Sequence, residues 1–171
     1  GETIAIKGDC VVFSNELFDA QPCVRTVFRR GLWHEIGVRL EGDRLVETEW
    51  PAEVGEPGME GYHFDRPKAA AELAGEIAAQ PWQGLFVAFD YGKTLPELQE
   101  NTPSGSLRAY HRHVQSNDLL SRPGEQDLTC HVCWDWMIAA LGRSGFASPT
   151  LEFQEAFFVH HATSVIAATS A

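Results

Sequence analysis

Two apolar stretches decide the fold of this chain: residues 10–16, Cys-Val-Val-Phe-Ser-Asn-Glu, and residues 85–92, Leu-Phe-Val-Ala-Phe-Asp-Tyr-Gly. Each is a continuous hydrophobic run that ends in polar residues, which is typical of a parallel strand buried on both faces. Residues 67–79 lie between them and place Leu73 and Ile77 four apart behind a proline, which predicts an amphipathic helix. Strand, helix and strand in this order predict a right-handed crossover in an α/β fold.

The other segments are shorter. Residues 22–49 alternate in polarity around two glycine turns, which predicts an antiparallel β-meander inserted between the first strand and the helix. The same reasoning predicts strands over residues 107–113 and 150–159, a helix over residues 134–144, and a polar surface loop over residues 93–105.

Composition limits the classes of protein. The 171 residues are 44% hydrophobic, which suits one folded domain, residues 1–171, and excludes a disordered chain. A net charge of −11 argues against nucleic-acid binding and favours a cationic partner. The sequence contains no apolar run of the ~20 residues that a spanning helix needs and no targeting segment, so we expect no membrane partner.

The four cysteines are expected to be free thiols, because a chain of this size builds a core without disulfides. Cys130 and Cys133 have the spacing of half a zinc site, but no second pair of close cysteine or histidine residues flanks them. We therefore expect no bound metal.

Polar residues follow both predicted strands. Asn15, Glu16 and Asp19 come after the first strand, and Asp90 and Tyr91 come after the second. Because ligands bind beyond the carboxyl ends of parallel strands, we expect these side chains to face one crevice, where carboxylates can orient a cation or accept a proton. Helix capping by Asn15 or Asp19 is the alternative.

A second group of polar residues begins in the strand predicted over residues 107–113. Its members are Arg108, Tyr110, His111 and His113, followed by Asp127, Thr129 and His131. In an extended strand His111 and His113 share one face, the spacing of a two-histidine metal site. Two interpretations therefore remain: a metal-dependent enzyme that uses His111, His113 and His131, or an exposed strand whose polar residues have no catalytic role.

Four motifs, in order, resemble those of the MidA family of S-adenosylmethionine-dependent methyltransferases. They are Ser-Asn-Glu-Leu-Phe-Asp-Ala-Gln-Pro (14–22), Phe-Asp-Tyr-Gly (89–92), Leu-Arg-Ala-Tyr-His-Arg-His (107–113) and Pro-Gly-Glu-Gln-Asp-Leu-Thr-Cys-His-Val (123–132). Cys130 and Cys133 stand where the family pattern has Ala and Asp.

The resemblance implies the later strands of a Rossmann-like class I methyltransferase sheet and S-adenosylmethionine as the cofactor of the full-length protein. Mitochondrial members of the family methylate an arginine of a respiratory complex I subunit during assembly. The resemblance therefore implies arginine methylation of a basic protein substrate, in the cytoplasm of a bacterium or the mitochondrial matrix of a eukaryote.

Carried over by motif, Glu16 is the carboxylate that orients the guanidinium, with Asn15 and Asp19 beside it in the catalytic turn. Asn15 also borders the methionine end of the cofactor, and Asp90 and Tyr91 border the acceptor pocket. The remaining motif residues are assigned to substrate binding, either by direct contact or through a shared hydrogen-bond network. They are Arg108, Tyr110, His113, Asp127, Thr129 and His131.

The family's glycine-rich cofactor loop and first three strands precede the motif that here begins at Asn15. The resemblance covers residues 10–155 and only the C-terminal half of the family's domain. We therefore expect this chain alone to hold no cofactor and to be inactive, and a non-catalytic assembly module is the alternative function. An unpaired strand edge at residues 10–14, which residues 3–7 can partly cover, predicts a dimer, strand exchange or a rearranged amino-terminal segment.

Overall fold

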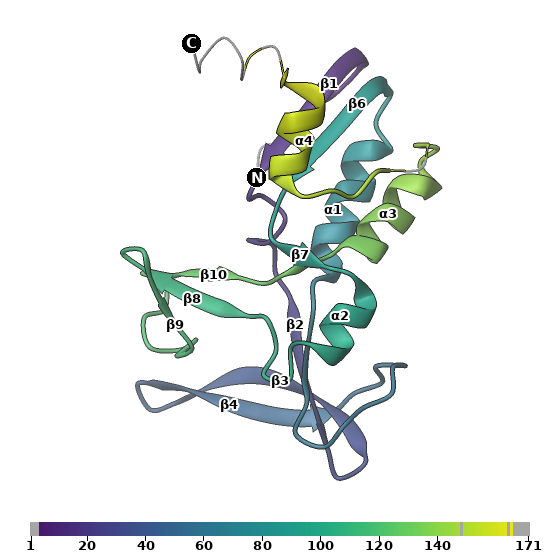
Figure 1. Ribbon diagram of the computed structural model, residues 1–171. Helices are drawn as coiled ribbons and strands as arrows, with labels where there is room; N and C mark the ends of the chain where they lie inside the picture. The colour runs from purple at the N-terminus through teal and green to yellow at the C-terminus, as the bar shows by residue number, and fades with distance from the viewer. Residues whose placement is uncertain (1–3, 148, 164, 166–171) are drawn as a thin grey trace.

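The computed structural model describes residues 4–147, 149–163 and 165 (Figure 1). In chain order its elements are β1 (Gly8–Asn15), β2 (Val24–Arg29), β3 (Leu32–Glu41), β4 (Arg44–Pro51), β5 (His63–Arg66), α1 (Lys68–Ala78), β6 (Trp82–Phe89), β7 (Gly92–Lys93), α2 (Leu95–Glu100), β8 (Arg108–His111), β9 (Val114–Ser116), β10 (Asp127–Thr129), β11 (Val132–Cys133), α3 (Trp134–Arg143) and α4 (Gln154–His161). Among the described residues, no helix has the length and apolarity needed to cross a bilayer.

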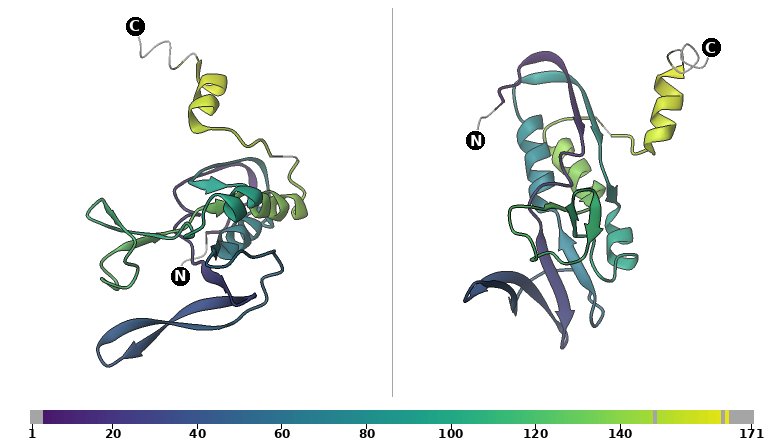
Figure 2. Two further views of the ribbon diagram at one scale, coloured as in Figure 1. Left: turned by 60° about the horizontal axis from the view of Figure 1, so that its bottom comes forward. Right: turned by 90° about the vertical axis from the view of Figure 1, so that its left-hand side faces the viewer.

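The two apolar runs form the parallel pair β1 and β6, with α1 between them in the chain, as the sequence predicts. The prediction that both strands are buried on two faces is wrong, because Val11, Phe13 and Leu85 are exposed on one face of the pair. The register of the two strands places Cys10 opposite Gly84. Gly84 has a φ of 137°, and a Cβ there would lie 2.0 Å from the carbonyl oxygen of Cys10, so only glycine fits. Figure 2 shows α1 and α4 on opposite sides of this strand pair.

The main core lies between the β1–β6 pair and the helices α1 and α3. Small side chains bring the two helices together, because Ala70 and Ala74 of α1 are fully buried and a Cβ at Gly75 would lie 3.7 Å from that of Ala140. Leu73 and Ile77, predicted as the apolar face of α1, are only partly buried and pack at the rim of this core. The closest helix packing therefore uses alanine and glycine rather than the larger residues.

A four-stranded antiparallel sheet in the order β4-β3-β2-β5 lies beside the parallel pair. The strand β5 has no hydrophobic run and joins the sheet by pairing with β2, from Val24 opposite Arg66 to Val27 opposite His63. A second core beneath this sheet contains Trp33 of β3 and Leu98 of α2, among other residues.

The prediction of a surface loop over residues 93–105 is wrong, because α2 lies within it. The carboxylate of Glu97 accepts hydrogen bonds from both the backbone N–H and the hydroxyl of Thr94, at 2.8 Å each, and this capping box starts the helix. Leu98 is 1% exposed, and its carbonyl accepts a hydrogen bond from the hydroxyl of Tyr62, which docks α2 on the second core.

Two predicted strands also differ from the structure. Residues 150–159 do not form a strand, because α4 covers most of this range and packs Phe157 and Phe158 against Phe89. The strand predicted over residues 107–113 ends at His111, and Arg112 and His113 form the turn to β9 with positive φ angles of 49° and 64°.

A buried carboxylate joins the four-stranded sheet to the β8 hairpin. Asp65 of β5 is 2% exposed and pairs with the guanidinium of Arg25, with an N–O distance of 3.0 Å. Its Oδ2 also accepts hydrogen bonds from the backbone N–H groups of Ser106, at 2.6 Å, and Leu107, at 2.8 Å. One side chain therefore fixes the approach of the segment before β8.

Candidate functional site

The turns that follow β1 and β6 meet and are joined by Asp90. Its carboxylate accepts hydrogen bonds from the backbone N–H groups of Phe18, at 2.8 Å, Asp19, at 3.2 Å, and Tyr91, at 2.9 Å. The N–H of Glu16 donates to the carbonyl of Phe89 at 2.8 Å and continues the pairing of the strands. The structure thus brings the turn after β1, residues 15–19, and the turn after β6, residues 90–92, to one edge of the sheet.

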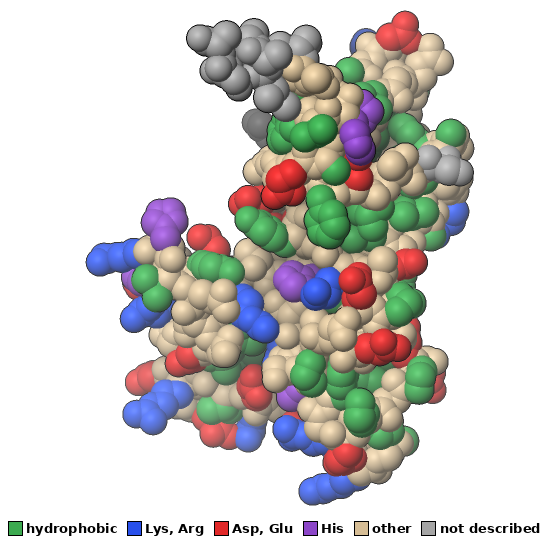
Figure 3. All heavy atoms as spheres, viewed as in Figure 1, with side chains coloured by type: hydrophobic (Ala, Val, Ile, Leu, Met, Phe, Trp, Pro, Cys, Tyr) green, Lys and Arg blue, Asp and Glu red, His purple; other side chains and the backbone are tan. Residues whose placement is uncertain are grey.

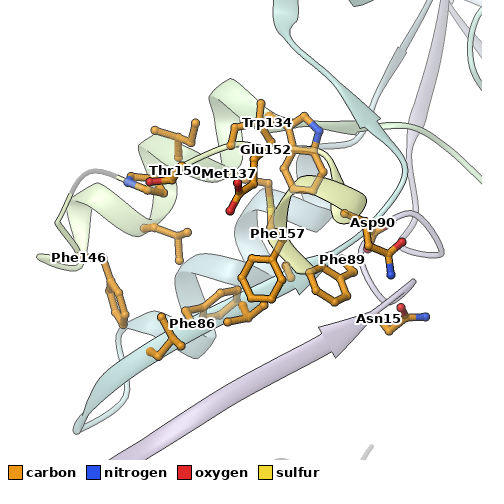
Figure 4. Close-up of a pocket in the computed structure, with 18 of the residues that line it drawn as sticks. Asn15, Phe86, Phe89, Asp90, Trp134, Met137, Phe146, Thr150, Glu152 and Phe157 are labelled. Atoms are coloured by element: carbon orange, nitrogen blue, oxygen red, sulfur yellow. The ribbon is translucent and has the colours of Figure 1, made fainter. Parts of the chain in front are cut away.

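A groove of about 680 Å³ begins at this edge and runs along β6. Asn15, Glu16, Asp90 and Tyr91 line one end of it. In Figure 4 the rest of the wall is largely aromatic and aliphatic, with Phe146 at the opposite end from Asn15 and Asp90. The site therefore combines an acidic mouth with an apolar body, as small-ligand and side-chain sites commonly do.

Burial raises the pKa values of two carboxyl groups, that of Asp90 in the lining of the groove and that of Asp19 in the turn behind it. Asp19 is 5% exposed, and its burial, together with the charges of Asp90 and Glu16, raises its pKa to about 6. Burial also raises the pKa of Asp90, against the opposing effect of its backbone hydrogen bonds. None of these three carboxylates pairs with a cationic side chain within the described part of the chain.

The backbone of Glu16 is strained. Its φ of 51° is uncommon for a residue with a long side chain and puts it in the left-handed region, immediately beyond the last residue of β1. Such strain persists where surrounding contacts hold it, and it concentrates at functional sites. Here the hydrogen bond from Glu16 to Phe89 and those from Phe18 and Asp19 to Asp90 fix the turn.

The connection from β10 to β11 joins the two turns from a third side. The N–H of Cys130 donates to the carbonyl of Asp19 at 2.8 Å, and the N–H of Val132 donates to the carbonyl of Tyr91 at 2.9 Å. His131 lies between these anchors and is therefore at the margin of the crevice. Burial, followed by the charges of nearby Lys93 and Arg108, lowers the pKa of His131.

The structure separates the remaining predicted residues. Arg108 lies opposite Thr129 in the β8–β10 pair, next to the His131 connection. Tyr110 pairs with Asp127 farther along the same two strands. Of the residues predicted to bind substrate, only Asp90 and Tyr91 line the groove; the others lie outside its lining, namely Arg108, Tyr110, His113, Asp127, Thr129 and His131. Figure 1 shows β8, β9 and β10 projecting away from the β1–β6 pair.

The expectation that His111 and His113 share one strand face is wrong, because His113 belongs to the turn. The imidazole Nδ1 of His111 instead hydrogen-bonds the carbonyl of Glu125 at 2.7 Å. Among the residues that the structure describes, no three His, Cys, Asp or Glu side chains are grouped to hold a metal ion. The metal-dependent alternative therefore has no geometric support.

The sequence did not point to the far wall of the groove. Trp134 and Met137 of α3 and Phe157 of α4 line it, as does Glu152 from the segment before α4. Because a strand was predicted over residues 150–159, the contribution of α4 to this wall was not predicted. For Trp134 the sequence did contain a signal: it is an aromatic residue at the start of the predicted 134–144 helix, directly after the Cys130–Cys133 segment.

Comparison with known proteins identifies the family. Residues 2–150 match the model of a family described as "Putative S-adenosyl-L-methionine-dependent methyltransferase". The chain belongs to this methyltransferase family. No match was found among curated proteins.

Two crystal structures from Burkholderia thailandensis resemble this member of the methyltransferase family. One protein was crystallised with S-adenosyl-homocysteine and the other in native form, and both belong to one superfamily. Each has 25% sequence identity and a TM-score of 0.75 over 84% of this chain. The chain spans 40% of the length of the first structure and 41% of the second.

The described residues fit only part of a site for S-adenosylmethionine. The mouth of the groove lies where a parallel sheet presents its ligands, and its carboxylates suit a cationic group. However, neither of the two junctions at which a strand leads directly into a long helix contains glycine: β5–α1 passes through Pro67, and β11–α3 passes from Cys133 to Trp134. The described residues thus lack the glycine-rich strand-to-helix turn that a nucleotide-like cofactor requires.

Proposed function

We propose that this chain forms the acceptor side of the crevice in an S-adenosylmethionine-dependent protein arginine methyltransferase. The observation that carries the proposal is the cluster of three uncompensated carboxylates, Glu16, Asp19 and Asp90, at the carboxyl ends of two parallel strands. A group of carboxylates without an internal cation is suited to an external one, and a guanidinium binds carboxylates through paired hydrogen bonds.

Each residue at the mouth has a distinct task under this proposal. Glu16 is the carboxylate that holds the guanidinium, since its strained turn projects from the strand end and its charge is not neutralised by another side chain in the described residues. Asp90 holds the turn through backbone hydrogen bonds, and Asp19 adds negative charge behind it. Tyr91, 61% exposed, offers an aromatic surface against which a guanidinium can stack.

The cofactor of this reaction class supplies an electrophilic methyl group on a sulfonium. Because donor and acceptor are then both cationic, the enzyme gains rate by positioning the acceptor and reducing charge repulsion. Glu16, Asp19 and Asp90 serve that purpose. The relatives are more than twice as long as this chain, so we propose that the cofactor-binding loop belongs to a region outside it, and that the chain alone binds S-adenosylmethionine weakly or not at all.

The decisive experiment assays Glu16→Gln in the full-length protein with an arginine-containing peptide and radiolabelled S-adenosylmethionine. Loss of the orienting charge is expected to lower kcat/KM by about 10²-fold, the range found when one electrostatic contact to a transition state is removed. Glu47→Gln, on the exposed face of β4, is the matched control and should leave activity unchanged. Equal activity of wild type and Glu16→Gln would refute the assignment.

A non-catalytic assembly module is the second candidate, and exposed apolar residues on the β3–β4 hairpin favour it. Val38 and Leu40 lie on one face of the hairpin and are 52% and 67% exposed, which is typical of a surface that contacts another protein. The same assay separates the two functions, because an assembly module needs no Glu16 charge. Loss of partner binding in Leu40→Ser, with methylation unaffected, would assign the hairpin to docking rather than to chemistry.

A further inference from the structure

A basic patch adjoins the acidic mouth of the groove and consists of Lys93, Arg108 and His131. Strand pairing brings these residues together from distant parts of the chain. Lys93 is opposite Cys133 in the β7–β11 pair, and Arg108 is opposite Thr129 in the β8–β10 pair. His131 lies in the short connection between those two paired segments, and its N–H donates to the hydroxyl of Ser106 at 3.2 Å.

The two cations of the basic patch form no direct ion pair with a carboxylate of the described residues. Lys93 does act electrostatically on the nearby carboxylate of Glu97 in α2. The guanidinium of Arg108 donates through Nη1 to the carbonyls of Gly105, at 3.1 Å, and Leu107, at 2.7 Å, which fixes its position. The chain carries a net charge of −11, so two cations without a direct ion pair are a distinctive feature of its surface.

His131 also has unused hydrogen-bonding capacity. Its Nδ1 is buried and has no hydrogen-bond partner among the described residues. Burial, followed by the charges of Lys93 and Arg108, lowers the pKa of His131, so its imidazole offers a hydrogen bond rather than a positive charge.

The basic patch and the acidic mouth are held at a fixed separation. The residues on either side of His131 are hydrogen-bonded to Asp19 and to Tyr91, so the same short connection forms part of both surfaces. Figure 3 shows this face of the molecule, where a histidine lies next to basic side chains, one acidic side chain lies directly beside them, and further acidic side chains lie above. A ligand that spans the two surfaces must carry both signs of charge.

We propose that Lys93, Arg108 and His131 bind a carboxylate of the acceptor beside the guanidinium held by Glu16. The acceptor is then a protein segment with an acidic residue close to the methylated arginine. This inference rests on the proposed function, because it specifies the substrate of the same crevice. Complementary charges on both sides of the arginine fix its register and disfavour segments in which basic residues surround it.

The test measures binding of two synthetic peptides to the chain by isothermal titration calorimetry. In one peptide a glutamate flanks a central arginine on each side, and in the other these glutamates are glutamines. We expect the glutamate peptide to bind about 5-fold more tightly, as partly exposed charge-assisted hydrogen bonds allow. In Lys93→Gln this preference should fall to less than 2-fold, and Lys7→Gln, at an exposed residue of the amino-terminal segment, should retain it.

The outcomes distinguish the inference from the proposed function. Equal affinity for the two peptides, a preference that Lys93→Gln leaves intact, or no binding of the glutamate peptide at millimolar concentration would overturn the inference. If Glu16→Gln does not weaken the glutamate peptide while the preference over the glutamine peptide persists, the anion site stands and the guanidinium assignment fails. If Glu16→Gln weakens both peptides and neither is preferred, only the proposed function stands.

Discussion

Asp65 and Asp90 are both carboxylates that hold distant segments together, and they differ in how their charge is balanced. Asp65 accepts two backbone hydrogen bonds and also pairs with Arg25, which completes its surroundings. Asp90 accepts three backbone hydrogen bonds but has Asp19 as its neighbour instead of a cation. The first arrangement is closed and structural, whereas the second leaves negative charge available to a ligand.

Removal of the Asp65 carboxylate should give the largest loss of stability. Asp65→Ala leaves the guanidinium of Arg25 and the backbone N–H groups of Ser106 and Leu107 without their acceptor, which is expected to cost about 3–5 kcal/mol in unfolding free energy. Urea denaturation of wild type and Asp65→Ala measures this loss of unfolding free energy. Glu47→Ala, an exposed residue of β4, is the control, and a loss below about 1 kcal/mol would show that the junction is not structural.

Asp90→Ala should destabilise the chain less and disturb the site more. The N–H groups of Phe18, Asp19 and Tyr91 lose their acceptor near solvent, for a cost of about 1–3 kcal/mol. Hydrogen exchange should show lost protection at the amide of Phe18 with little change at Ser106. Asp90→Asn keeps one carbonyl oxygen as an acceptor and should therefore lose less unfolding free energy and less amide protection than Asp90→Ala. Unchanged exchange at Phe18 in Asp90→Ala would contradict the role of this side chain.

The smallest expected effect is a change in how stability depends on pH. The pKa of Asp19 is raised in the folded chain, from 3.8 to about 6, so between these values the native state binds more protons than the unfolded state. This group therefore makes stability fall as pH rises from about 4 to 6. Asp19→Asn should remove that contribution, so its stability relative to wild type should be higher at pH 7.5 than at pH 4.

Denaturation of both proteins at these two pH values measures the difference. Asp43→Asn, in the exposed turn between β3 and β4, serves as the matched control, because a carboxyl group in solvent should not alter the profile in the same way. A pH profile that is identical for wild type and Asp19→Asn would contradict the raised pKa of Asp19.

The parts of the fold that local sequence determines were predictable. The apolar runs of β1 and β6 and the helix between them each follow from residues close together in the chain. The signal for α2 was also present, because Thr94 and Glu97 have the spacing of a capping box, but Pro96 suggested a loop. A short polar strand such as β5 depends on its partner β2 and has no comparable local signal.

The candidate site was predictable to a similar extent. The rule that ligands bind beyond the carboxyl ends of parallel strands places Glu16 and Asp90 in the site from the sequence alone. The same rule could not show that Asp90 accepts hydrogen bonds from the Phe18 turn, or that Lys93 lies near His131, because these contacts join segments distant in sequence. The strand reading of residues 107–113 failed at a two-residue turn in which neither residue is glycine.

The outer face of the β1–β6 pair has a thermodynamic consequence. Val11 and Leu85 are register partners on this face, and with Phe13 they are 67%, 56% and 59% exposed. Within the described residues β1 pairs only with β6, and residues 4–7, predicted to cover its free edge, form no strand. Self-association or any other contact that covers these side chains should release hydration water and show a negative change in heat capacity, a calorimetric mark that a purely polar contact lacks.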